Sequence, residues 1–150
     1  GTYNYEPYQQ AQKLVPKIAL NALEALSQPI YGNGLQQRDW IFVADHCRAI
    51  LAALKRGTVG ESYNISANNV RTNLNLVRSI CREVDSLLGR SAGHSETLIT
   101  HVADRPGHDQ RYSLDARKIQ QELGWEPIAH FDAALRETVS WYVGSRWAAA

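Results

Sequence analysis

The sequence predicts an α/β fold that is rich in helices and contains only short, scattered strands. Two observations lead to this prediction. Four segments carry apolar residues at helical spacing, and three short apolar segments with strand character lie between them. The strands are too short and too far apart to form a doubly wound sheet by themselves, so we expect a helix-rich domain that lacks such a sheet.

Four amphipathic helices account for most of the expected core. Each places its apolar residues three and four positions apart, so that they form one stripe along the helix. Pro16 falls in the first turn of the first helix, where its missing N–H removes no hydrogen bond. The stripes are Val15, Ile18, Ala19, Ala22, Leu23 and Leu26; Cys47, Ile50, Leu51 and Leu54; Leu74, Val77, Cys81, Val84 and Leu88; and Phe131, Ala134, Leu135, Thr138, Val139 and Tyr142.

Strand and turn signals fill the intervals between these helices. Residues 40–43, 62–65 and 98–102 are predicted to be short strands or extended segments. Gly32-Asn33-Gly34 predicts a tight turn after the apolar residues 29–31. A further short helix should begin after a cap at Asp115 and end at Gly124, because helix ends favour Asp first and Gly last.

Composition and charge exclude several classes of partner. The 150 residues are 44% hydrophobic and 21% charged, as in a soluble globular protein. Sixteen basic and 15 acidic residues give a net charge of +1, so nothing favours nucleic acid or an anionic membrane. The apolar runs are too short to span a bilayer. Scattered histidines without ligand spacing make a metal site unexpected.

The two cysteines are expected to be buried thiols. Cys47 and Cys81 occupy apolar positions of helical stripes, which favours buried, reduced thiols in the cytoplasm over the alternative of a disulfide.

The sequence contains no methionine, even at position 1, where a translated reading frame begins. We therefore expect the chain to be a piece of a longer protein.

Familiar catalytic motifs are missing from the sequence. The ten glycines form no G-x-G-x-x-G or G-x-x-G-x-x-G pattern, which a dinucleotide pyrophosphate needs for close backbone approach. None of the seven tyrosines is followed four residues later by a lysine, the spacing at which a lysine would lower the tyrosine pKa. The chain alone is therefore expected to contain no catalytic residue and to be inactive.

Three stretches carry a family resemblance. Residues 37–46, QRDWIFVADH, resemble a segment of the extended short-chain dehydrogenases that act on nucleotide sugars. Residues 104–112, DRPGHDQRY, resemble a segment of the dTDP-glucose 4,6-dehydratase branch, and residues 122–127, ELGWEP, extend the match. Residues 4–8 and 13–16, NYEPY and KLVP, resemble the crossover that leaves the nucleotide domain in that family. The matches follow the family's order from residue 1 to about residue 143.

The resemblance implies a fold, an activity and a cofactor. It identifies residues 1–143 as a nucleotide-sugar-binding C-terminal domain of the extended short-chain dehydrogenase fold, without the Rossmann sheet, and leaves 144–150 as a frayed tail. The family's enzymes are cytoplasmic and use NAD to oxidise dTDP-glucose at C4, eliminate water across C5 and C6, and return the hydride to C6. This chain would contribute substrate binding, while the catalytic residues and the NAD site would lie in the missing Rossmann domain.

Two residues are implied to bind the substrate diphosphate. Arg38 matches the family's arginine, and a guanidinium offers a planar fork for two phosphate oxygens. The alternative for Arg38 is a salt bridge to Asp39 or Asp45. Asn73 matches the family's asparagine, although Thr72 or Asn73 could equally be the N-cap of the following helix. The two roles of Asn73 are compatible, because helix N-termini attract phosphate.

The resemblance implies further contacts around the nucleotide sugar. The 104–108 loop would close over the nucleotide and its ribose, although Asp104 and Arg105 could instead form a solvated ion pair. The implied substrate-binding residues are Lys13 and Leu14 at the sugar diphosphate, Pro29, Ile30 and Tyr31 beside the base, and Asp104, Arg105, Pro106, Gly107 and His108 in the loop. Asn4 matches the asparagine that touches the nicotinamide end of NAD.

Two positions depart from the family pattern. Tyr3 stands where the family has an asparagine, and Glu6 stands where it has a glycine. The first change removes an amide near the sugar phosphate, and the second would repel that phosphate unless the carboxylate points away.

Two other functions stay open. The chain could be a stand-alone, non-catalytic binding or interaction module, or part of a sibling epimerase or decarboxylase. The expected ligand is dTDP-glucose or a related nucleotide sugar. The apolar surface that would meet the missing domain should be exposed and could drive self-association.

Overall fold

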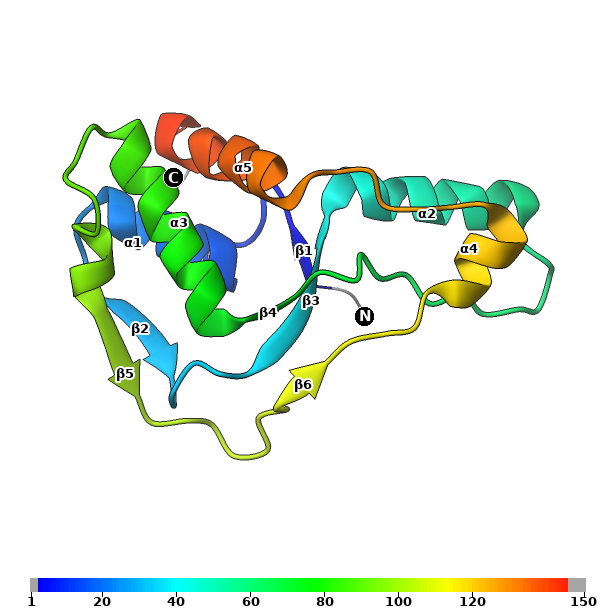
Figure 1. The fold of residues 1–150 in the computed structure, drawn as a ribbon, viewed down its shortest axis with the longest axis horizontal. Coiled ribbons are helices and arrows are strands. Elements are labelled where there is room, and N and C mark those ends of the chain that lie inside the picture. Colours follow the sequence, from blue (N-terminus) through cyan, green and yellow to red (C-terminus); the bar gives the residue numbers. More distant parts are fainter. Residues whose placement is uncertain (1–2, 146–150) are drawn as a thin grey trace.

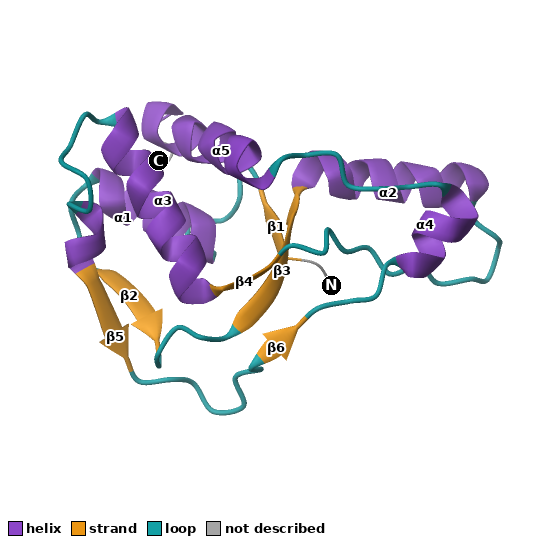
Figure 2. Ribbon diagram, in the orientation of Figure 1, coloured by secondary structure: helices purple, strands orange, loops and turns teal. Residues whose placement is uncertain are grey.

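The structure is a computed structural model that describes residues 3–145 and places two groups of helices around a small central sheet (Figures 1 and 2). Helices α1, α3 and α5 form one group, and α2 and α4 form the other, with β1, β3 and β4 between them (Figure 1). The elements are β1 (Tyr3–Tyr5), α1 (Leu14–Leu23), β2 (Gln28–Tyr31), β3 (Gln37–Phe42), α2 (Val43–Arg56), β4 (Val70–Thr72), α3 (Asn73–Leu87), the 3-10 turn η1 (Ser95–Leu98), β5 (Ile99–Val102), β6 (Arg111–Tyr112), α4 (Arg117–Leu123) and α5 (Phe131–Ser145).

Strand β3 organises the sheet. Its second half pairs in parallel with β1, and its first half pairs with antiparallel β4 and parallel β6. Strands β2 and β5 form a separate parallel pair. The sheet therefore joins segments that are far apart in sequence, from Tyr3 to Tyr112.

The main core lies among α1, α3, α5 and one face of β1 and β3. All six predicted stripe residues of α5 are buried, and so are Val77, Cys81 and Val84 of α3. Burial raises the pKa of the Cys81 thiol to about 12, which makes the thiol inert. Helix α1 ends at Leu23, because Ala25 has a left-handed φ of 55°, so Leu26 lies in a loop rather than on the predicted stripe.

A second, smaller core joins α2 to α4. It contains Ile41, Ala49, Ala52, Ala116, Ile119, Leu123 and Trp125. The predicted end of α4 is confirmed, because Gly124 adopts the left-handed conformation with φ 59°. The predicted cap is one residue off: the N-cap is Ala116, and Asp115 before it accepts a hydrogen bond from the backbone N–H of Arg117 at 2.9 Å.

The predicted buried stripe of α2 is wrong. Ile50, Leu51 and Leu54 are 52%, 51% and 80% exposed, and Cys47 is exposed as well. The buried face of α2 consists instead of Asp45, Ala49 and Ala52, whose small or hydrogen-bonded side chains allow α4 and residues 125–129 to approach closely. The helix thus presents an uncovered apolar face.

Two further expectations differ from the structure. Residues 62–65 are not a strand, because no neighbouring strand pairs with them within residues 3–145. Helix α5 extends to Ser145, so Gly144 and Ser145, the first residues of the predicted frayed tail, are helical. The rest of that tail, residues 146–150, lies outside the described residues.

Candidate functional site

A cleft of about 710 Å³ opens where β1, β2, β3, the starts of α1 and α3, and the loop before β6 meet. Arg38, Asn73, Arg105 and His108, which are far apart in sequence, all line this one cleft. Lys13, Leu14, Pro29, Ile30, Tyr31 and Asn4 line it as well. The remaining lining residues are Tyr3, Gln9, Gln12, Lys17, Trp40 and Tyr112.

The cleft wall is positively charged. Four basic side chains, those of Lys13, Lys17, Arg38 and Arg105, line the cleft, and no Asp or Glu does so among the described residues. The whole chain has a net charge of only +1. Positive charge is therefore concentrated here, and the cleft is suited to an anionic ligand.

Arg38 is the most deeply buried of these cations. The residue is 2% exposed, and its Nη1 donates a hydrogen bond to the backbone oxygen of Gln37 at 2.7 Å. Its guanidinium carbon lies 5.3 Å from the centre of the Tyr3 ring, within range of a cation–π contact. Among residues 3–145 it has no carboxylate partner. A buried cation of this kind needs an anion to compensate its desolvation.

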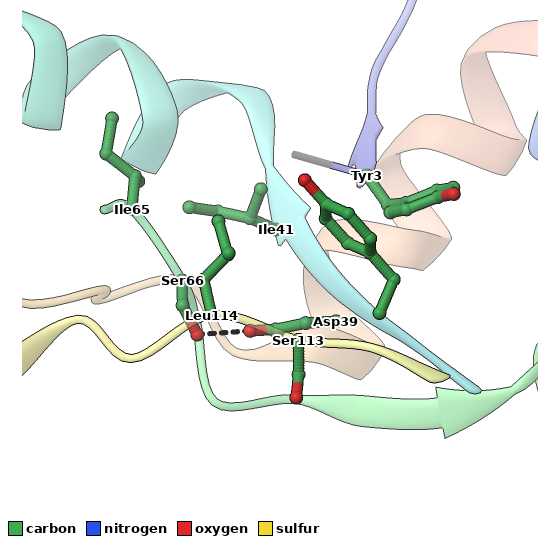
Figure 3. A pocket seen from close by; sticks show the side chains of 8 residues that line it. Tyr3, Asp39, Ile41, Ile65, Ser66, Ser113 and Leu114 are labelled. Carbon is green, nitrogen blue, oxygen red and sulfur yellow. Dashed lines mark hydrogen bonds between the residues drawn. The ribbon is translucent and has the colours of Figure 1, made fainter. Parts of the chain in front are cut away.

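The two carboxylates considered as partners of Arg38 are both engaged elsewhere. Asp39 accepts hydrogen bonds from the Ser66 hydroxyl and from the backbone N–H of Asn69, and Figure 3 shows the Asp39–Ser66 contact. Asp45 accepts from Arg48 and from the backbone of residues 128 and 129. The salt-bridge alternative for Arg38 is therefore wrong.

The pocket drawn in Figure 3 is too small for an organic ligand. Its volume is about 10 Å³, room for no more than one water molecule. Its lining side chains include Ile41, Ile65 and Leu114, beside the Asp39–Ser66 hydrogen bond (Figure 3). Tyr3 and Tyr112 line both this pocket and the large cleft.

Two helices begin at the cleft. Lys13 and Leu14 stand at the N-terminus of α1, and Asn73 is the first residue of α3. The Thr72 hydroxyl accepts a hydrogen bond from the Asn75 backbone N–H at 3.1 Å, so Thr72 is the N-cap. The Asn73 side chain is thus left for the cleft. Helix N-termini favour bound anions, which adds to the positive side chains.

Tyr31 and His108 place two rings side by side in the cleft wall. Tyr31, at the end of β2, is 51% exposed, and its ring lies edge-to-face with the His108 imidazole at 6.2 Å between centroids. Pro29 and Ile30 complete this wall. A half-exposed ring beside apolar residues can stack on a flat ring of a ligand.

Only part of the 104–108 loop reaches the cleft. Arg105 and His108 line it, whereas Asp104, Pro106 and Gly107 do not. Asp104 accepts hydrogen bonds from the Arg105 backbone N–H and from His108 Nδ1, and the bond from His108 lowers the pKa of the Asp104 carboxyl. No ion pair joins the side chains of Asp104 and Arg105 in the part of the chain described.

Asn4 lies at the edge of the cleft beside His46. Its side-chain oxygen is 2.9 Å from His46 Nδ1, and its backbone oxygen accepts from Gln9 at 3.1 Å. Burial lowers the pKa of His46, and the Glu6 carboxylate partly opposes this effect. Asn4 is therefore held at the cleft by a histidine that burial favours in the neutral form.

The two departures from the family pattern have different consequences. Glu6 does not line the cleft, so its carboxylate does not face a ligand there. Tyr3 does line it, and its ring contacts Trp40 and Tyr112 edge-to-face, each at 5.5 Å between centroids. An aromatic ring that supports the Arg38 guanidinium thus stands where an amide was expected.

Sequence reasoning missed five cleft residues: Gln9, Gln12, Lys17, Trp40 and Tyr112. Lys17 follows Lys13 by four residues, and helical spacing could have placed both on one face of α1. Tyr112 ends the 104–112 stretch and could have been included with it. Nothing in the local sequence distinguishes Gln9 or Gln12.

Within residues 3–145, no three His, Cys, Asp or Glu side chains lie close enough together to hold a metal ion. None of the described helices has the length and apolar character needed to cross a membrane.

Comparisons with known proteins agree on one family. Residues 2–138 match the family model described as GDP-mannose 4,6 dehydratase. The dTDP-glucose 4,6-dehydratase of Salmonella typhimurium is 47% identical over 142 residues, which are 95% of this chain and 39% of that protein. The chain thus spans about two fifths of the length of the curated relatives it matches.

Solved structures share the fold. The dTDP-glucose 4,6-dehydratase of Bacillus anthracis, in complex with NAD, is 44% identical with a TM-score of 0.83, over 97% of this chain and 44% of that one. DesIV, the dTDP-glucose 4,6-dehydratase of Streptomyces venezuelae with NAD and TYD bound, is 39% identical with a TM-score of 0.85, over 97% of this chain and 42% of that one. The chain therefore belongs to the GDP-mannose 4,6 dehydratase family, and the relatives that it resembles are dTDP-glucose 4,6-dehydratases.

Proposed function

We propose that the chain is the nucleotide-sugar-binding part of an NAD-dependent dTDP-glucose 4,6-dehydratase, with residues 1–143 as the binding domain. The observation that carries the proposal is the cleft, where Arg38, Asn73, Arg105 and His108 meet and where none of the described acidic side chains lines the wall. A nucleoside diphosphate supplies the anion that such a wall favours. The dehydratase branch is supported by relatives that are 44–48% identical to this chain and are dTDP-glucose 4,6-dehydratases.

The cleft suggests how the ligand would lie. The diphosphate would bind between Arg38 and the N-termini of α1 and α3, with Lys13 and Leu14 on one side and Asn73 on the other. The base would stack beside Tyr31, with Pro29 and Ile30 as the apolar wall. This orientation leaves the sugar at the end of the cleft near Asn4. Holding the ring in one orientation is how a binding domain contributes to a reaction.

The cofactor would make little contact with this chain. When bound, NAD accepts and returns a hydride. Asn4 fits a contact to its nicotinamide end, because a neutral amide stands at the cleft edge and is fixed by His46. The chain has neither a glycine-rich dinucleotide loop nor a Tyr-x-x-x-Lys pair. We therefore assign the Rossmann sheet, the remaining NAD contacts and the catalytic residues to another part of the protein.

The outer face of α2 supports the proposal that another part of the protein packs against this chain. Ile50, Leu51 and Leu54 are at least half exposed, an apolar surface that water solvates poorly. Residues 62–65 have the alternation of a strand but no strand partner among residues 3–145. Another part of the protein that packed on α2 would bury this apolar surface, and the edge of its sheet could pair with residues 62–65. In its absence, self-association through α2 is the alternative.

The proposal is tested by calorimetric titration of the chain with dTDP-glucose, UDP-glucose and GDP-mannose, with thymidine as a control that lacks the diphosphate. We expect dTDP-glucose to bind most tightly and thymidine much more weakly. Affinity should fall as salt increases, because the contacts are between charges. Preference for UDP-glucose or GDP-mannose would favour a sibling enzyme. Equal binding of thymidine and dTDP-glucose would reject the diphosphate site.

A further inference from the structure

The 104–108 loop is anchored through Asp104, which does not itself reach the cleft. One carboxylate oxygen, Oδ1, accepts from the Arg105 backbone N–H at 2.9 Å and faces His108 Nδ1 at 2.7 Å. The other, Oδ2, accepts from Gln36 Nε2 at 2.7 Å. A Cβ at Gly32 would lie 3.0 Å from Oδ2, so glycine at that position gives the carboxylate its space. The carboxylate therefore connects the loop to Gln36, the residue just before β3.

Gln36 is a buried connection between two sides of the cleft. The residue is 2% exposed, and it does not line the cleft. Its side chain donates to Asp104, while its backbone oxygen accepts from the Asn73 N–H at 2.9 Å. Gln36 thus fixes the start of α3 through its backbone and the loop through its side chain. Its Oε1 atom has no hydrogen-bond partner within the described residues, so Nε2 makes the side chain's hydrogen bond.

His108 is the residue at the end of this series of contacts. Its side chain is 7% exposed, lines the cleft and packs edge-to-face against Tyr31. Donation from Nδ1 to an ionised carboxylate fixes the tautomer and the ring orientation. Nε2 is then the ring nitrogen left for a ligand: it accepts a hydrogen bond when the ring is neutral and donates one when the ring is charged.

We propose that Gln36 and Asp104 are positioning residues that act through His108, orienting Nε2 of its imidazole toward a phosphate or hydroxyl oxygen of the ligand in the cleft. This proposal rests on the proposed function for the identity of the ligand. It changes the role of Asp104 from a direct contact to an indirect one, and it gives a role to Gln36, which no sequence motif had indicated. An imidazole whose orientation is fixed before the ligand arrives loses less conformational freedom when the ligand binds.

The substitution Gln36→Met tests the proposal, because methionine retains most of the volume and removes the donor to Asp104. The readouts are the tautomer of His108, from ¹⁵N imidazole shifts at about pH 8, above the ordinary histidine pKa, and the affinity for dTDP. We expect the Nδ1–H tautomer to lose population and the affinity to fall about 3- to 10-fold, the effect of one misplaced hydrogen bond.

Gln28→Met is the matched control. Gln28 is fully buried, its side-chain atoms have no hydrogen-bond partner among residues 3–145, and it does not line the cleft. The same chemical change at this site should alter neither the His108 tautomer nor dTDP affinity. A thermal unfolding curve for each variant separates loss of folding from loss of positioning.

A double-mutant cycle identifies the residue through which Gln36 acts. In a His108→Ala background, Gln36→Met should cause no further loss of dTDP affinity, because the ring that it positions is gone. An equal loss in both backgrounds, or an unchanged His108 tautomer in Gln36→Met, would overturn the proposal. If the parent chain bound no dTDP, the proposed function would fail, and the tautomer would still decide whether Gln36 sets the ring.

Discussion

Replacing Arg38 by alanine should weaken dTDP binding by roughly 10- to 100-fold, the effect of removing a charged hydrogen-bond donor from a buried site. The guanidinium is 2% exposed and has no carboxylate partner among residues 3–145, so the diphosphate is the anion that it would meet. Arg38→Lys should restore only part of the affinity, because an ammonium group lacks the planar fork. Calorimetric titration of both variants measures the effect.

Arg111→Ala provides the matched control for this experiment. Arg111 is an exposed arginine of β6, next in sequence to Tyr112, but it does not line the cleft. Its replacement removes one positive charge while leaving the cleft wall intact, and dTDP affinity should stay close to that of the parent. If Arg38→Ala bound dTDP as tightly as Arg111→Ala does, Arg38 would not be the diphosphate ligand.

Replacing Asp45 by alanine should lower the free energy of unfolding by about 2 to 4 kcal/mol, because it leaves buried donors without an acceptor. The Asp45 carboxylate is 3% exposed and accepts from the backbone N–H groups of Ile128 at 3.1 Å and Ala129 at 2.9 Å. It also receives Arg48 Nη1 at 2.6 Å. These contacts join the start of α2 to the segment that leads into α5. Urea unfolding followed by circular dichroism measures the change.

Asp109→Ala serves as the control for Asp45→Ala. Asp109 is exposed in the loop before β6, so its removal should leave the unfolding midpoint near that of the parent. The Asp45 interpretation would be wrong if both variants unfolded at the same urea concentration. Binding of dTDP should persist in Asp45→Ala under conditions where it is folded, since Asp45 does not line the cleft.

The helical periodicity of the sequence predicted α5 and α3 well, because their stripes face a core that the chain itself provides. All six stripe residues of α5 are buried. The same reasoning failed for α2, where Ile50, Leu51 and Leu54 are exposed. Periodicity identifies an apolar face but does not specify what covers it, and the contacts to α4 use the small Ala49 and Ala52 instead.

The strands could be predicted less completely. Strand β3 carries the apolar run of residues 40–42, whereas β4 and β6 are only three and two residues long and contain Arg71 and Arg111. Such short segments become strands by pairing with β3, which local sequence does not encode. Residues 62–65 show the converse, since strand-like sequence without a partner does not form a strand here.

The candidate site was predictable where the family resemblance supplied it and unpredictable where it depends on tertiary contacts. The resemblance named ten of the residues that line the cleft, including Arg38 and Asn73. It also named Asp104, Pro106 and Gly107, which the structure places outside the cleft wall. Gln36 could not be found from sequence, because its role depends on a hydrogen bond to a residue 68 positions away.

The most direct test of the central claim is an NMR titration of the ¹⁵N-labelled chain with dTDP. If Arg38, Asn73, Arg105 and His108 all face one diphosphate, their backbone amides should shift together with a single dissociation constant, while the amides of the outer face of α2 stay unchanged. Shifts confined to one of these three segments, or centred on α2, would contradict the account.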